Sequence, residues 1–198
     1  NGLGSTLVTV FGAEDINLIA SADGLQTNRV LKALTNPPVR SIGGLLPGPS
    51  TTWNGVVLIT NDVIVPLGHT LTIESNTIIL IQGVTNGTVA NDIAVSGTLL
   101  SLGTEDHPVT ITCAEVDQMH RWGQIRHNNA RPSVYRFTNI NRGGRSNGEG
   151  HTGTAPVIRV VGSKITFESC SITDLAEPLN STPDFGMPGK IMQTSLGS

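Results

Sequence analysis

The fold is decided by residues 93–112, which read IAVSGTLLSLGTEDHPVTIT. Three short runs of β-branched and aliphatic residues, 93–95, 98–100 and 109–111, are separated there by turn-forming Ser-Gly and Gly-Thr pairs. Runs of this kind, without helical spacing, predict strands of about three to five residues. Strands this short and closely spaced suit a solenoid, in which each strand pairs with the coil before it and the coil after it.

Short apolar runs separated by turn residues also occur before and after this stretch, and parts of the sequence repeat. Residues 56–81 contain four further short apolar runs with turn residues between them. A phrase that begins at Ile158 begins again at Ile191, 33 residues later, and Phe137 and Phe167 lie 30 residues apart in strand-like stretches. Periods of this length are typical of solenoids. We therefore expect parallel strands about one coil apart in sequence.

Two stretches also resemble a known superfamily. Residues 53–73 read WNGVVLITNDVIVPLGHTLTI, and residues 93–112 are followed by WGQI at 122–125. They resemble the pectate-lyase-like right-handed parallel β-helix superfamily of bacterial extracellular proteins, and the resemblance covers residues 53 to about 175. It implies an all-β, right-handed parallel β-helix. It does not specify an activity, because this superfamily includes lyases, hydrolases, adhesins and surface proteins.

The chain is expected to have two parts. Residues 1–50 read as a small N-terminal appendage that caps the first coil, with a strand at 7–11, an amphipathic helix after Asp23 and a Pro/Gly-rich linker. Residues 51–198 read as the N-terminal part of a β-helix. Its last residues repeat a phrase that earlier leads into a strand, so we expect the β-helix to be incomplete at its C-terminal end. A second chain that continues the stack after Ser198 is the partner this pattern predicts.

Composition excludes several classes of protein. Hydrophobic residues make up 37% of the chain and charged residues 14%, which excludes a disordered chain and a coiled coil. The net charge of −3 argues against nucleic-acid binding. No apolar run approaches the ~20 residues that span a bilayer. We expect a secreted or cell-surface protein whose signal peptide has already been removed.

Charge is unevenly distributed along the chain. Residues 118–151 contain six arginines, no lysine and a single acid, whereas the remaining sequence holds six basic residues and fourteen acids. Arginine binds carboxylates and sulfates through two parallel hydrogen bonds, and histidine suits proton transfer near neutral pH. This stretch predicts a groove for an acidic polysaccharide, the alternative being outward arginines that are solvated or paired with acids. The candidates are His127 and His151 as catalytic base, and Trp122, Arg126, Arg142, Arg145 and Glu149 for substrate binding.

Two functional classes remain open at this point. The first is a polysaccharide lyase or glycoside hydrolase, or a protein that binds such a polymer; the second is a non-enzymatic adhesion module of the cell surface. No cofactor is evident, and no Cys/His spacing indicates zinc. Calcium stays open as an alternative, although the chain has no Asp-rich loop. Cys113 and Cys170 could form a disulfide or be two thiols in neighbouring coils.

Overall fold

The structure is a computed structural model that describes residues 16–22, 25–31, 39–85, 90–117, 119–145, 155–176 and 191–193. The chain divides into two compact units, Asn1–Val39 and Arg40–Ser198. The predicted linker therefore contributes its second half to the larger unit. Within the described residues every regular element is a strand.

The described part of the first unit is a β-hairpin. Strand β1 (Ile16–Ala22) pairs antiparallel with β2 (Leu25–Leu31), and Ala22 is opposite Leu25 at the turn. The amphipathic helix expected after Asp23 is wrong, since this segment is β2. Its β-branched residues and Asn28 have modest helix propensity, and pairing with β1 supplies the backbone hydrogen bonds instead. The strand predicted at 7–11 lies outside the described residues.

The larger unit is a parallel β-solenoid with three faces. Strand β3 (Arg40–Leu45) runs beside the long strand β5 (Val56–Val65), which turns a corner and contributes to two faces. Face A consists of the first half of β5, β7 (Ile78–Ile81), β10 (Val109–Cys113), β13 (Thr138–Asn141) and β16 (Ser171–Thr173). Face B consists of the second half of β5, β8 (Ile93–Val95), β11 (Ile125–Asn128), β14 (Ile158–Val161) and β17 (Ile191–Gln193). Face C consists of β4 (Ser50–Trp53), β6 (Thr70–Ile73), β9 (Thr98–Leu102), β12 (Ser133–Arg136) and β15 (Ile165–Glu168).

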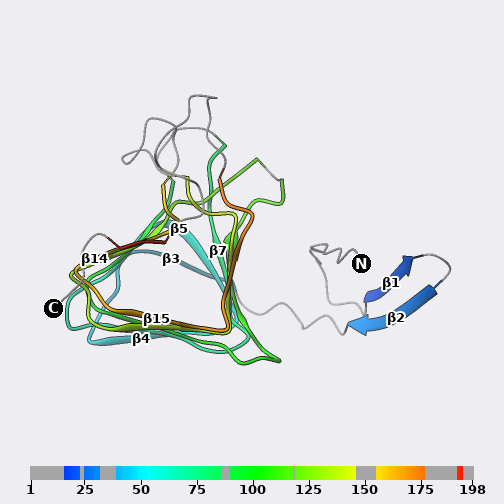
Figure 1. The fold of residues 1–198 in the computed structure, drawn as a ribbon, viewed down its shortest axis with the longest axis horizontal. Coiled ribbons are helices and arrows are strands. Elements are labelled where there is room, and N and C mark those ends of the chain that lie inside the picture. The colour runs from blue at the N-terminus through cyan, green and yellow to red at the C-terminus, as the bar shows by residue number, and fades with distance from the viewer. Residues whose placement is uncertain are drawn as a thin grey trace. The chain divides into compact units, whose positions relative to one another are not determined.

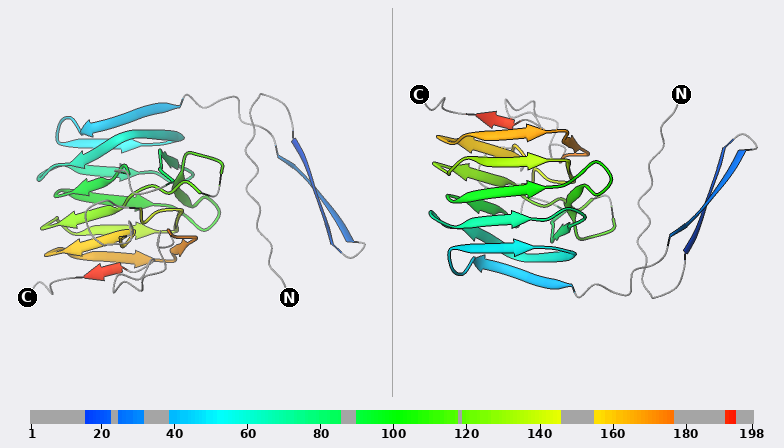
Figure 2. Two further views of the ribbon diagram at one scale, coloured as in Figure 1. Left: turned by 90° about the horizontal axis from the view of Figure 1, so that it is seen from above. Right: turned by 90° about the horizontal axis from the view of Figure 1, so that it is seen from below.

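The coils stack in one direction with a right-handed turn. Viewed along the stack, the strands outline a triangle (Figure 1). Side views show successive coils lying above one another (Figure 2). All strand pairs of the described solenoid are parallel, and the strands from β6 to β8, from β9 to β11 and from β12 to β14 each complete one turn. The predicted all-β, right-handed parallel β-helix is confirmed.

Alternation along each strand builds the core. On face B the inward ladder contains Val63, Ile93, Ile125 and Ile158, which occupy successive coils in register and are fully buried. Burying each such aliphatic side chain contributes about 1.5–3 kcal/mol relative to leaving it exposed. The residue between two inward positions necessarily points outward. The interior is thus apolar, and the outer surface of each face is a set of columns one residue wide.

Sharp corners repeat from coil to coil because the same backbone conformation recurs there. At three corners, the residues at equivalent positions of two successive coils both have positive φ angles. Left-handed conformations let the chain change direction within one or two residues. The pairs are Asn129 with Gly162, Phe137 with Ser169, and Arg142 with Asp174, with φ between 43° and 58°.

The strand pairing confirms one of the predicted repeats and shows that another is wrong. Ile158 pairs with Ile191, as the 33-residue period predicts. The equivalence of Phe137 and Phe167 is wrong. Phe167 pairs with Tyr135 and stacks on its ring at 5.1 Å, whereas Phe137 occupies a corner. Phe167 is only partly buried, and β15 has a single partner strand among the described residues. The second chain after Ser198 stays a prediction.

Candidate functional site

On face B, one column of outward-pointing side chains changes from aliphatic to cationic residues along the stack. Leu45, Ile64, Ala94, Arg126 and Arg159 follow one another in register on β3, β5, β8, β11 and β14. The column begins with exposed aliphatic side chains, passes through one small residue and continues with two adjacent arginines. Neighbouring strands are about 4.8 Å apart, so the two guanidinium groups share one patch of surface.

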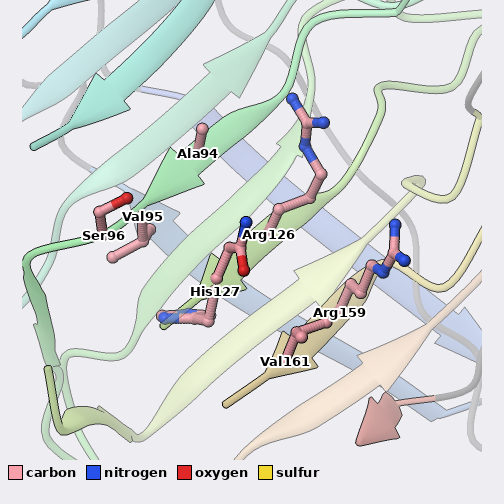
Figure 3. A pocket seen from close by; sticks show the side chains of 8 residues that line it. Ala94, Val95, Ser96, Arg126, His127, Arg159 and Val161 are labelled. Carbon is pink, nitrogen blue, oxygen red and sulfur yellow. The ribbon is translucent and has the colours of Figure 1, made fainter. Parts of the chain in front are cut away.

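A surface pocket of about 390 Å³ opens beside these arginines. Ala94 leaves room for it, because its methyl group is short between longer neighbours. Ser96, Asn128 and Val161 line the pocket as well. The side chains of Arg126 and Arg159 extend to the same side, and that of His127 points away from them (Figure 3). The pocket is therefore cationic, with an apolar edge.

Asp92 lies at the Arg126 end of the pocket, just before β8. Its Oδ2 atom is 3.3 Å from Nε of Arg126, and its Oδ1 atom accepts a hydrogen bond from the backbone N–H of Gln124 at 2.8 Å. Burial raises the pKa of Asp92 to about 6; the Gln124 hydrogen bond and the Arg126 charge oppose this rise, and the carboxylate of Asp62 adds to it. Asp92 is a carboxyl group that changes charge near neutral pH.

The sequence analysis identified Arg126 but not Arg159 or Asp92. Arg159 was detectable, since Ile125-Arg126 and Ile158-Arg159 are the same pair of residues 33 positions apart. That spacing equals the period of the Ile158 repeat. Asp92 had no such signal. Its burial follows from its position at a corner, against Gly123 of the next coil, where a Cβ would lie 1.8 Å from its Oδ1 atom.

His127 lines the pocket, but its side chain belongs to the core. It follows Arg126 on β11, so its side chain points inward, where 1% of the residue is exposed. Its Nε2 atom is 2.9 Å from the hydroxyl of Tyr135, a fully buried residue on β12 of face C. Burial lowers the pKa of His127 to about 4. This placement argues against His127 as a base for an external substrate.

Arg142 and Arg145 are also buried, and they organise the long connections. These connections follow face A in three successive coils, and their described parts meet at one corner of the triangle (Figure 1). The guanidinium of Arg142 donates to the carbonyl oxygens of Glu115 at 2.5 Å, of His120 at 3.2 Å and of Asp117. Burial and the nearby Arg121 lower the pKa of Arg145. Neither arginine is placed to hold a ligand on face B.

The remaining candidates are distributed differently from the expectation. Trp122 is fully buried and its indole Nε1–H donates to the carbonyl of Asn141 at 2.7 Å, so it cannot stack on a sugar. Glu149 and His151 lie outside the described residues. Cys113 and Cys170 are free thiols. Among the predicted site residues that the structure describes, Arg126 and His127 line the pocket, and of the two only Arg126 directs its side chain outward.

Replacing Arg142 with alanine is expected to destabilise the fold without changing anion binding at face B. Three carbonyl oxygens lose a charged donor, and the corner loses its shared partner, which we expect to lower the free energy of unfolding by about 3 kcal/mol. Urea unfolding followed by circular dichroism measures this. Arg131→Ala, on an exposed turn, is the matched control and should change stability by less than about 0.5 kcal/mol. Equal stability of the two variants would contradict the structural role.

No family model, curated protein or solved structure matches this chain. Within the described ranges, no group of three or more His, Cys, Asp or Glu residues is arranged to hold a metal ion. The same ranges contain no helix of sufficient length and apolarity to cross a membrane.

Proposed function

We propose that the outer surface of face B binds an acidic polysaccharide. The observation that carries this proposal is the in-register pair of Arg126 and Arg159 beside a pocket. Guanidinium groups hold carboxylates or sulfates in a defined orientation, and two of them on adjacent strands present their donors to one ligand.

A polymer fits this surface better than a small anion does. The two arginines lie along the stack axis, so a chain with an acidic group on successive sugars can engage both at once, which raises affinity through effective concentration. The aliphatic side chains of Ile64 and Leu45 continue the same column and are exposed. Sugar rings have apolar faces that can pack on such residues. We place the polymer along this column.

We further propose that the chain is a secreted or cell-surface member of the pectate-lyase-like superfamily. The parallel three-faced solenoid and the phrases at 53–73 and 93–112 support this proposal. Only binding is proposed, not lyase or hydrolase chemistry, because the described catalytic candidate, His127, is in the core. A non-enzymatic adhesion module is compatible with such binding.

The proposal is tested by calorimetric titration with an oligouronate and with its methyl-esterified, neutral form. We expect tighter binding of the acidic form, weakened when salt rises from about 0.05 M to about 0.5 M. Arg126→Gln and Arg159→Gln should each lower affinity about tenfold, the equivalent of one charge-assisted hydrogen bond. Circular dichroism checks that both variants stay folded.

Arg136→Gln is the matched control. Arg136 is exposed on face C and pairs with Glu168 at 2.7 Å, so its loss removes the same charge from a different face. It should leave the affinity within about twofold of the wild type. Equal affinity for the acidic and neutral oligosaccharides, or equal effects of all three substitutions, would refute a site on face B and favour the adhesion module.

A further inference from the structure

We propose that protonation of Asp92 releases Arg126 to external anions, so that the site on face B binds anions more tightly as pH falls. This inference rests on the function proposed above and adds its regulation. Asp92 is an internal competitor for the guanidinium that an external ligand must engage.

The competition follows from the contacts of Asp92. Its Oδ2 atom faces Nε of Arg126 at 3.3 Å, while its Oδ1 atom is held by the backbone N–H of Gln124 at 2.8 Å. The side chain of Asp92 is 12% exposed and that of Arg126 is 39% exposed. The carboxylate is thus fixed and largely shielded from water, whereas the guanidinium reaches the pocket. A ligand can approach Arg126 but cannot displace Asp92.

The charged groups around Asp92 act on it in opposite directions. Asp62, on β5, accepts a hydrogen bond from the backbone N–H of Asp92 at 2.8 Å and places a second negative charge nearby. Arg126, on β11, is the positive group that offsets it, and Arg159, on β14, is the next cation along the column. When Asp92 is ionised, its carboxylate offsets the charge of Arg126. When Asp92 is protonated, that positive charge becomes available to a ligand.

Thermodynamic linkage gives the consequence for binding. A bound anion near Arg126 repels the Asp92 carboxylate, so the complex holds a proton more firmly than the free protein does. Binding near pH 6 therefore takes up a proton, because burial raises the pKa of Asp92 into this range. With charges several ångströms apart in a partly shielded corner, we expect affinity to rise about tenfold between pH 7.5 and pH 5.

The test uses a dextran sulfate oligosaccharide, because its sulfate groups keep their charge over this pH range. Titration calorimetry at pH 7.5, 6 and 5, in buffers of different ionisation enthalpy, measures both the affinity and the protons taken up. The wild type should show the tenfold rise and an uptake of a fraction of a proton per site near pH 6. Asp92→Asn should bind tightly at every pH with no such uptake. It keeps the shape and the Gln124 hydrogen bond, so it should fold.

Asp174→Asn is the matched control. Asp174 pairs with Arg121 at 3.0 Å in the corner formed by the long connections, and asparagine tolerates its positive φ. This variant should retain the pH dependence of the wild type. Binding that is independent of pH in the wild type, or a pH dependence that persists in Asp92→Asn, would overturn the inference while leaving the anion site intact. No binding of dextran sulfate or of the oligouronate at any pH would overturn both.

Discussion

Replacing Gly97 with alanine is expected to prevent stable folding of the solenoid. Gly97 lies in the turn between β8 and β9, directly against the preceding coil. A Cβ there would lie 2.2 Å from the carbonyl oxygen of His69 and 2.4 Å from that of Pro66. Both are backbone atoms, so no side-chain rotation relieves the contact. The coils would have to separate at this turn.

Separation breaks the hydrogen bonds that define the stack. The N–H groups of Ser96 and Gly97 both donate to the carbonyl of Val65, at 2.9 and 3.1 Å, and Thr98 donates to His69 at 2.9 Å. We expect the free energy of unfolding to fall by more than about 4 kcal/mol, in the range reserved for severe overpacking and lost backbone pairing. Urea unfolding and the yield of soluble protein measure this.

Gly68→Ala separates lack of space from backbone strain. Gly68 has φ of +82° and no atom within 4 Å of an added Cβ, so alanine there is strained but not obstructed. We expect it to destabilise the fold by about 1–2 kcal/mol. A Gly97→Ala variant no less stable than Gly68→Ala would show that the coil spacing at this turn can adjust.

The sequence pattern predicted most of the solenoid, because short strands are determined by the alternation of neighbouring residues. The apolar runs at 78–81 and 93–95 became β7 and β8 with the same bounds. Each inward position lies two residues from the next, which sequence displays directly. The segment that became β2 was misread, because its pairing with β1 is decided by tertiary contact and not by its own propensity.

The candidate site was harder to predict for a physical reason. Arginine in a charge-rich stretch can face solvent or bind carbonyls of a neighbouring loop, and local sequence does not distinguish Arg126 from Arg142. The alternation of inward and outward residues does predict that His127 points inward. With Ile125 inward and Arg126 outward, the next residue must be inward. The prediction instead placed His127 in the groove because histidine suits proton transfer near neutral pH. Its interior partner, Tyr135, could not be inferred from spacing.

The buried His127–Tyr135 pair is expected to make the fold sensitive to acid. Burial lowers the pKa of His127 from 6.5 to about 4, so the unfolded chain binds a proton more readily than the folded protein does between these values. Stability is therefore present above about pH 6.5 and is lost as pH falls toward 4. From this shift the loss between pH 7.5 and pH 5 is about 2 kcal/mol.

Asp92 produces the opposite trend, so the stability of the wild type shows only the difference between the two effects. Its pKa is raised from 3.8 to about 6, and the folded protein binds the proton more readily in that window. Its contribution to stability is present below about pH 3.8 and is lost as pH rises through 6, which amounts to about 1 kcal/mol between pH 5 and pH 7.5. The two groups lie on adjacent coils, and Asp92 offsets about half of the histidine effect in this range.

Single-site variants should separate the two contributions. Asp92→Asn leaves the histidine effect alone, so its stability should fall more steeply on acidification than that of the wild type, by about 1 kcal/mol between pH 7.5 and pH 5. The double variant His127→Leu, Tyr135→Phe replaces both partners with apolar groups and leaves no buried hydroxyl unpaired. Its stability relative to the wild type should rise by about 2 kcal/mol over the same interval.

Urea unfolding at pH 7.5, 6 and 5 measures these differences, and subtraction from the wild type removes the titration of all other groups. Arg136→Gln, on the outer surface of face C, is the control and should follow the wild-type profile. If the double variant instead kept the wild-type dependence on pH, His127 would be exposed to solvent in the folded protein. The histidine would then be available to the groove, and its role as a catalytic base would regain support.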